Sequence, residues 1–254
     1  MTSSPENQRA YEIAGPVGAP AIVFLHGIRV TRRMWQLQIE RLKGEFRVIA
    51  LDLPGHGSQR GIDFSLKAAI DCIASVIDRE ARGRALVVGL SLGGYVAMEF
   101  GARYPSKAAG LVIASASVEP SGWYNFPYRG MAWALEKMPE NWTSWMSCKF
   151  FEFVYGDERA RLLTDPGFYA RGGVQAFHEL FEKRFRPAVA AYTGPVLFLN
   201  GARDLGFRLQ ERKFLAAAPN GRLQTIPRAF HIANLDQPET FTEAVRSFAK
   251  SIAW

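Results

Sequence analysis

The sequence predicts an α/β fold with a mostly parallel sheet that is covered by helices on both faces. Short, continuous apolar runs are typical of strands buried on both sides, and the stretches between them space their apolar residues as helices do. The chain has 254 residues, which is enough for one well-buried domain, and its 48% hydrophobic and 22% charged residues are a globular composition.

Five apolar runs are predicted to form the central strands. They are 21–25 (AIVFL), 47–51 (RVIAL), 85–90 (ALVVGL), 110–114 (GLVIA) and 195–200 (PVLFLN). The stretch YEIAG near residue 11 is a candidate antiparallel edge strand, and a shorter run, RLQTIP, follows the last of the five. Because strand and helix patterns alternate along the chain, the strands are expected to lie parallel.

Two further stretches show clear helical spacing. One carries Leu66, Ile70, Ile73 and Ile77, and the other, near the end of the chain, carries Phe241, Val245, Phe248 and Ile252. The last helix also has a start signal in Asp236 and Pro238.

The alternation stops between Glu119 and Pro187, where no buried-strand pattern occurs. This stretch holds half of the chain's aromatic residues in about a quarter of its length, including tryptophans at 123, 133, 142 and 145. We interpret residues 119–187 as an inserted helical lid and residues 1–118 and 188–254 as the core. A lid above a sheet has two apolar faces, and one of them is expected to line a ligand cavity.

The strongest chemical signal is Gly89-Leu90-Ser91-Leu92-Gly93-Gly94. This G-x-S-x-G pattern directly follows a predicted strand and directly precedes a predicted helix. A nucleophile elbow needs this context, because its sharp turn leaves little room for flanking side chains and exposes the serine hydroxyl above the sheet. Ser91 is therefore the predicted nucleophile.

A serine nucleophile needs a histidine as base and a carboxylate to orient that base. Of the four histidines, His26 and His56 precede the serine and His178 lies in the predicted lid, which leaves His231 as the base. Asp204, which follows the strand at 195–200, is the predicted acid, in the order serine, acid, histidine. Glu119, after the strand at 110–114, is a competing acid.

An oxyanion hole is also required, and backbone N–H groups usually supply it. We expect one donor at Leu92, beside the nucleophile, and the other at Ile28, in the loop His26-Gly27-Ile28 after the first apolar run. Three side chains are predicted to contact substrate: Arg29 from the same loop, Trp123 from the lid and Phe230 beside the predicted base.

The motifs HGIRVTRRMW, FRVIALDLPGHG, GLSLGG and NGARD, with the late histidine, resemble the α/β-hydrolase family over nearly the whole chain. The resemblance implies an eight-stranded, mostly parallel sheet with a lid inserted after the sixth strand. A serine at the elbow argues against the dehalogenases and epoxide hydrolases of this fold, whose nucleophile is aspartate. Two positions depart from the family pattern. Phe230 stands where a small residue commonly precedes the histidine, and Arg29 stands where the carbon–carbon bond hydrolases typically have a glycine-proline run.

The predicted activity is hydrolysis of a small, partly hydrophobic carboxylic ester through an acyl-enzyme. A lactonase is the nearest alternative, because the motifs are also similar to the enol-lactonases of aromatic degradation. Arg29, Arg32 or Arg33 would then pair with a substrate carboxylate. The carbon–carbon bond hydrolases are a weaker alternative. A receptor that keeps the fold with little turnover belongs to a different class.

The motifs and the resemblance imply a small-molecule ester or lactone as the partner, and composition argues against nucleic acid and membrane. The formal charge of +7 is scattered in pairs such as Arg32 and Arg33, which does not predict nucleic-acid binding. No apolar run has the length of a membrane span, and the N-terminus lacks the pattern of a signal peptide, so a cytoplasmic monomer or small homo-oligomer is expected.

Cysteine usage and motifs give no sign of a disulfide framework, a cofactor or a metal. Cys72 and Cys148 are interpreted as structural thiols. The stretch Asp52-Leu53-Pro54-Gly55-His56-Gly57 offers a carboxylate and an imidazole, but it is interpreted as a structural turn of the family and not as a metal site.

Overall fold

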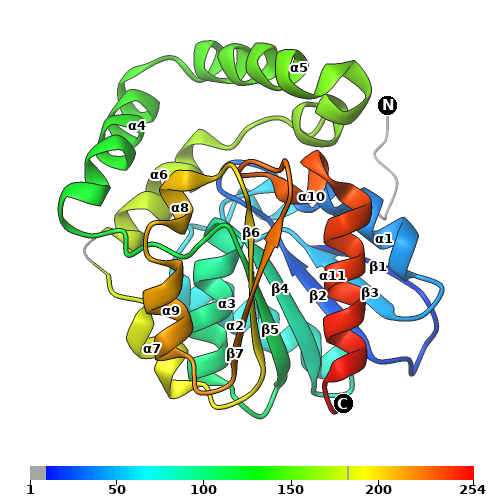
Figure 1. The fold of residues 1–254 in the computed structure, drawn as a ribbon. Coiled ribbons are helices and arrows are strands. Elements are labelled where there is room, and N and C mark those ends of the chain that lie inside the picture. Colours follow the sequence, from blue (N-terminus) through cyan, green and yellow to red (C-terminus); the bar gives the residue numbers. More distant parts are fainter. Residues whose placement is uncertain (1–9, 182) are drawn as a thin grey trace.

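The computed structural model describes residues 10–181 and 183–254, apart from the side chains of Trp123, Tyr124 and Pro127. Within these residues seven strands form one sheet in the order β1-β3-β2-β4-β5-β6-β7 (Figure 1). The strands are β1 (Tyr11–Ala14), β2 (Ala21–Leu25), β3 (Arg47–Leu51), β4 (Ala85–Leu90), β5 (Ala108–Ala114), β6 (Val196–Gly201) and β7 (Gly221–Ile226).

The sheet is parallel except at one edge. β1 pairs antiparallel with β3, and all other neighbouring strands are parallel. The predicted central strands and the antiparallel edge strand are therefore confirmed, although β5 begins two residues earlier than predicted, at Ala108. The described part of the chain holds seven strands, one fewer than the eight that the family resemblance implies.

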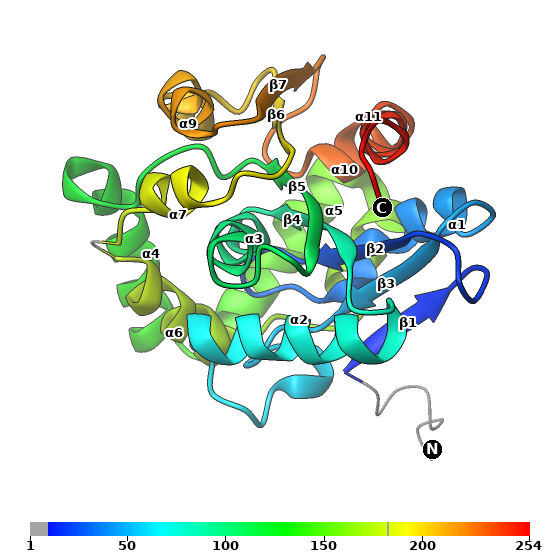
Figure 2. The same ribbon diagram turned by 90° about the horizontal axis from the view of Figure 1, so that it is seen from below.

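Helices cover both faces of the sheet. Those of the core are α1 (Gln36–Leu42), α2 (Leu66–Glu80), α3 (Leu92–Arg103), α7 (Arg186–Ala191), α8 (Leu205–Arg208), α9 (Glu211–Ala217), α10 (Ala233–Asp236) and α11 (Pro238–Ser251). Seen from below, α1 and α11 lie on one face, and α2 and α3 lie on the other with α7 beside them (Figure 2). The two predicted helical patterns correspond to α2 and α11.

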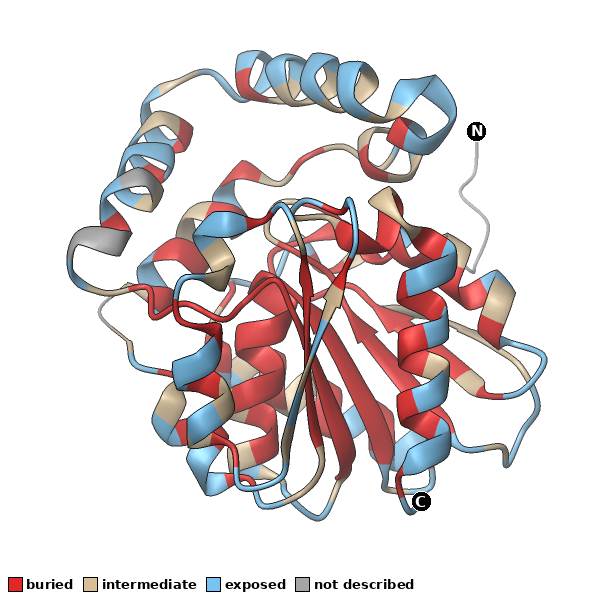
Figure 3. Ribbon diagram, viewed as in Figure 1, coloured by how far each residue is buried: buried red, intermediate tan, exposed pale blue. Residues whose placement is uncertain are grey.

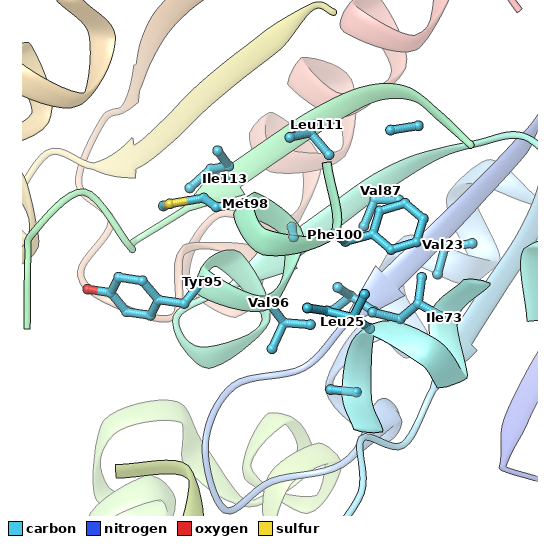
Figure 4. Close-up of a cluster of buried hydrophobic side chains, with 14 of the residues drawn as sticks. Val23, Leu25, Ile73, Val87, Tyr95, Val96, Met98, Phe100, Leu111 and Ile113 are labelled. Atoms are coloured by element: carbon cyan, nitrogen blue, oxygen red, sulfur yellow. The ribbon is translucent and has the colours of Figure 1, made fainter. Parts of the chain in front are cut away.

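The core consists of one apolar layer on each side of the central strands, which are buried along their lengths (Figure 3). On the α2–α3 side, Ile73 of α2 and Val96 and Phe100 of α3 pack with strand residues such as Val23 and Val87 (Figure 4). Burial on both faces explains why these strands are continuous apolar runs in the sequence.

Residues 119–187 lie between β5 and β6 and contain the helices α4 (Phe126–Lys137), α5 (Glu140–Thr164) and α6 (Ala170–Leu180), and α7 begins at the end of this segment. These three helices lie above the end of the sheet at which the parallel strands finish (Figure 1). α5 is interrupted at Gly156, which has a positive φ of 69°. Across the described residues, no helix combines the length and apolar character needed to cross a membrane.

Candidate active site

Ser91 sits at the sharp turn between β4 and α3. Its backbone is strained, with φ 54° and ψ −115°, and its N–H donates to the carbonyl of Ala114 at 2.9 Å. The flanking glycines are sterically required: a Cβ on Gly89 would lie 2.0 Å from the Gly93 carbonyl oxygen, and one on Gly93 would lie 2.2 Å from that of Leu25. The local geometry is that of the strand-turn-helix that the sequence pattern predicts.

Asp204 and His231 are brought together from two neighbouring loops. Nδ1 of His231 lies 2.9 Å from Oδ2 of Asp204, and the carboxylate is buried. Asp204 immediately follows the loop after β6, and His231 lies in the loop after β7. These loops are joined where the Arg203 N–H donates to the Ala229 carbonyl at 2.8 Å. Parallel pairing of β6 with β7 thus places the acid beside the imidazole.

Glu119, the competing acid, is engaged elsewhere. Its carboxylate accepts hydrogen bonds from the N–H groups of Phe185 at 2.7 Å and Arg186 at 3.0 Å, and from Nε of Arg186 at 2.9 Å. Its buried side chain therefore ties together the two ends of the 119–187 segment. In this structure the carboxylate within hydrogen-bond distance of His231 Nδ1 is that of Asp204.

His26 and His56 are buried and support the loops around the site. His26 accepts a hydrogen bond from Leu53 N–H at Nε2 (2.9 Å), and His56 accepts one from Arg29 N–H at Nε2 (3.1 Å). Burial lowers the pKa of both, for His56 to about 3, so both remain neutral acceptors. Asp52 pairs with the buried Arg32. Among the described residues, no cluster of three or more His, Cys, Asp or Glu side chains is placed to hold a metal ion.

A cavity of about 500 Å³ opens above Ser91 and also reaches His231. Its wall is mainly apolar, and the segment 119–187 supplies many of the aromatic side chains. They are Tyr128, Phe150, Phe151, Phe168, Phe177 and Phe181. The tryptophans at 133, 142 and 145 instead face outward, each 63% exposed. Phenylalanine and tyrosine therefore form the aromatic lining that the lid was expected to provide.

Sequence reasoning did not predict two aromatic residues that lie near His231, the predicted general base. The ring of Phe207 lies 4.2 Å from that of His231 between centroids, and Tyr128 meets Phe207 edge-on at 5.9 Å. Burial, followed by the negative charge of Asp204, raises the pKa of the Tyr128 hydroxyl, so this group stays protonated. Phe207 follows Asp204 by three residues on α8, and this helical spacing was the available signal.

The loop after β2 contributes Ile28 and Arg29 to the cavity wall. The neighbouring N–H groups are occupied, since Gly27 donates to Met34 Sδ at 3.4 Å and Arg29 donates to His56. For the Ile28 N–H, the described residues offer no acceptor. Leu92, the first residue of α3, also lines the cavity, and the first N–H groups of a helix have no acceptor within it.

The three predicted substrate contacts have different outcomes. Arg29 lines the cavity. The side chain of Trp123 lies outside the described residues. Phe230 was placed wrongly by the sequence interpretation: its ring is 53% exposed beside the Arg203 guanidinium and is not part of the cavity wall. The Phe230 N–H donates to Asp236 at 2.6 Å, and this contact holds the chain so that the next residue, His231, faces the cavity.

Comparison with known proteins gives a family match over most of the chain. A model described as the alpha/beta hydrolase family matches residues 22–244. Among curated proteins, 3-oxoadipate enol-lactonase 1 of Acinetobacter baylyi is 26% identical over 250 residues, covering 95% of this chain and 92% of that protein. A pimeloyl-[acyl-carrier protein] methyl ester esterase of Pectobacterium atrosepticum is 26% identical over 253 residues, covering 92% and 96%.

Solved structures give the same picture of the fold. A thermophilic esterase from Thermogutta terrifontis superimposes with a TM-score of 0.80 at 26% identity, covering 95% of this chain and 93% of that one. The enol-lactonase from Burkholderia xenovorans superimposes with a TM-score of 0.81 at 21% identity, covering 94% and 95%. At that identity, the second likeness concerns the fold alone.

Proposed function

Since this chain belongs to the alpha/beta hydrolase family, we propose that it hydrolyses small, partly hydrophobic carboxylic esters with Ser91 as nucleophile, His231 as base and Asp204 as orienting acid. One observation carries the proposal: His231, which is hydrogen-bonded to Asp204 through Nδ1, lines the same cavity as Ser91, whose backbone is strained. The bond at Nδ1 leaves Nε2 as the basic nitrogen.

In the proposed acylation, Ser91 Oγ attacks the ester carbonyl carbon while its proton passes to His231 Nε2. The developing oxyanion is held by the N–H groups of Ile28 and Leu92. The bond from the carbonyl carbon to the alcohol oxygen then breaks, and the imidazolium returns its proton to that oxygen. Asp204 stabilises the imidazolium throughout and is not itself protonated.

In the proposed deacylation, His231 takes a proton from a water molecule, whose oxygen attacks the acyl carbon. Collapse of the second tetrahedral intermediate breaks the bond to Ser91 Oγ, which recovers its proton from the imidazolium. The carboxylic acid leaves, and the enzyme is restored. The largely apolar cavity wall favours acyl or alcohol groups with a hydrophobic portion.

Residues 119–187 are proposed to act as a lid. The segment supplies much of the cavity wall, and both of its ends are joined at Glu119, so it can exclude water from the acyl-enzyme as one unit. Lactone opening is the second candidate activity, because an enol-lactonase is similar over 95% of the chain and the same three residues would perform it. The lactone differs only in that its leaving alcohol stays attached to the acyl group.

The test is steady-state hydrolysis of p-nitrophenyl esters of rising acyl length and of an enol-lactone by the wild type, Ser91→Ala and Ser115→Ala. Ser115 is the matched control, because it also follows a strand, has a positive φ of 49° and is buried outside the cavity wall. We expect Ser91→Ala to lose at least about 1,000-fold in kcat and Ser115→Ala to stay near the wild type.

Equal activity of Ser91→Ala and the wild type would refute the proposed nucleophile. Turnover of the lactone with no turnover of any ester would select the lactonase. If the wild type binds an apolar ester without hydrolysing any substrate, the receptor hypothesis replaces the enzyme.

A further inference from the structure

Arg29 is held in an unusual backbone conformation at the cavity wall. Its φ is 66°, a left-handed value that costs a non-glycine residue on the order of 1 kcal/mol or more. Two hydrogen bonds fix it: its N–H donates to the neutral Nε2 of His56, and its carbonyl accepts from Tyr169 N–H at 3.0 Å. The loop is therefore fixed on both sides, and the direction in which the Arg29 side chain leaves it is set.

The side chain of Arg29 lies between the core and the 119–187 segment. Its stem passes over Gly173 of α6, where an added Cβ would lie 2.6 Å from Arg29 Cγ. Its guanidinium carbon is 5.3 Å from the centre of the Phe168 ring, and Nη1 donates to Ser147 Oγ at 3.2 Å. Ser147 donates its own proton to the Thr143 carbonyl, so its oxygen is available as the acceptor.

The positive charge of Arg29 has no counter-charge in contact. Nε and Nη2 are buried without a hydrogen-bond partner, and among the described residues no carboxylate lies within ion-pair distance of this guanidinium. Glu140, at the exposed start of α5, acts on it only at longer range, and burial lowers the pKa of Arg29. Buried guanidinium N–H groups without a partner are costly unless an acceptor, best an anion, binds them.

We propose that Arg29 binds a carboxylate of the substrate, so that the substrate is an ester or lactone that carries a free carboxylate at the far end of an apolar chain. This inference rests on the proposed function, because it places Ser91 and Arg29 on one ligand. Nε and Nη2 form the edge of the guanidinium that holds a carboxylate through two parallel hydrogen bonds. Because both atoms are buried in this structure, binding requires the side chain to turn this edge toward the cavity.

The surroundings favour one monoanionic group over a phosphate. The remaining cavity wall is largely apolar, and the neighbouring arginines are not available to it: Arg32 is paired with Asp52, and Arg33 is exposed outside the cavity. Gly27, two residues before Arg29, lies against the nucleophile, with its added Cβ 3.8 Å from Ser91 Cβ. The loop after β2 thus runs from beside the nucleophile, at Gly27, to the proposed carboxylate site at Arg29. The apolar part of the substrate, between its ester group and its carboxylate, would fill the apolar space of the cavity.

The test compares the monobenzyl esters of adipic and suberic acid with their neutral counterparts, in which the free carboxylate is a primary carboxamide. Release of benzyl alcohol is followed for the wild type, Arg29→Gln, Arg29→Lys and the matched surface control Arg33→Gln. We expect the wild type to prefer the anionic ester about 100-fold in kcat/KM, mainly through KM, as for a buried charge pair. Arg29→Gln removes this preference, Arg29→Lys keeps part of it, and Arg33→Gln keeps all of it.

A wild-type preference near one, or a preference that survives in Arg29→Gln, would overturn the carboxylate site while leaving the proposed esterase intact. If Arg29→Gln does not fold, as judged by circular dichroism, the wild-type ratio and Arg29→Lys decide. If the wild type hydrolyses neither benzyl ester, the p-nitrophenyl panel described above decides the proposed function separately. Calorimetric titration of Ser91→Ala and of Ser91→Ala/Arg29→Gln with the anionic ester then decides the site: lost binding in the double variant supports it, and equal binding refutes it.

Discussion

The ring of Phe207 covers the imidazole of His231, with the two centroids 4.2 Å apart and the planes inclined by 37°. Tyr128 of α4 also contacts Phe207, edge-on, so the segment 119–187 reaches the predicted base through an aromatic residue of α8. The contact links the position of this segment to the orientation of the imidazole.

Replacing Phe207 by alanine is expected to raise KM for aromatic esters about tenfold, because an aromatic side chain of the cavity wall is lost, and to lower kcat, because the His231 ring loses its support. The loss should be smaller for acetate esters, which fill less of the cavity. Phe230→Ala is the contrasting variant: its ring is exposed outside the cavity, so its KM should match the wild type. A larger effect at Phe230 than at Phe207 would contradict this assignment.

Asp204→Asn is expected to lower kcat by about 1,000- to 10,000-fold with little change in the folded structure, because an amide cannot hold the imidazole in the required tautomer. Glu119→Gln should leave kcat within about threefold but lower the thermal midpoint, since its carboxylate joins the two ends of the 119–187 segment at Phe185 and Arg186. Ester hydrolysis and thermal unfolding of both variants check this. If Glu119→Gln lost most of its kcat while Asp204→Asn kept the wild-type kcat, Glu119 and not Asp204 would be the orienting acid.

His56 makes folding stability depend on pH. Burial lowers its pKa to about 3 in the folded protein, whereas in the unfolded chain it is about 6.5. Below pH 6.5 the unfolded state therefore binds a proton that the folded state does not, and the free energy of unfolding falls by up to about 1.4 kcal/mol per pH unit for this residue as pH falls toward 3. Above pH 6.5 its contribution is constant.

Urea unfolding at pH 7 and pH 5 checks this sign. We expect His56→Gln to be less stable than the wild type at pH 7 but to lose less stability on going to pH 5. The buried His26, whose pKa is also lowered by burial, keeps part of the pH dependence in that variant. His178→Gln is the control, because His178 is exposed beside Glu136, and its pH dependence should follow the wild type. An unchanged slope in His56→Gln would refute the prediction.

Gly93→Ala is expected to destabilise the fold by about 1–3 kcal/mol, because the added methyl group would lie 2.2 Å from the Leu25 carbonyl oxygen and force β2 and α3 apart. Gly130 is the matched contrast: it lies in α4, and an added Cβ there meets nothing within 4 Å. Gly130→Ala should gain about 0.5–1 kcal/mol from reduced backbone freedom in the unfolded chain. Urea midpoints of the two variants measure both effects.

The strands and the elbow were predictable because their causes are local. β2, β3 and β4 coincide with the predicted runs, since a strand buried on both faces must be apolar at every position. Ser91 was identified by the glycines around it, which the turn needs for steric reasons that act within a few residues. Helix α2 was predicted from the spacing of four apolar residues along one face.

The partners around the site were predicted less well, because they come from segments far apart in the chain. Phe230 stands next to the predicted base in sequence, yet the backbone contact with Asp236 turns its ring to the surface. Tyr128 and Phe207 are separated by 79 positions and meet only through the packing of α4 above α8. The spacing of residues along the sequence cannot predict a contact of this kind.

By itself, the sequence determined the order of strands and helices, the nucleophile elbow at Ser91 and the candidates Asp204 and His231, because these depend on short-range sterics and on the order of motifs along the chain. Only the tertiary structure decided that Asp204 and not Glu119 meets His231, and that Nε and Nη2 of Arg29 are buried without a hydrogen-bond partner beside the cavity. Burial and ion pairing are properties of how distant segments pack, and that packing fixes the electrostatic environment of each residue.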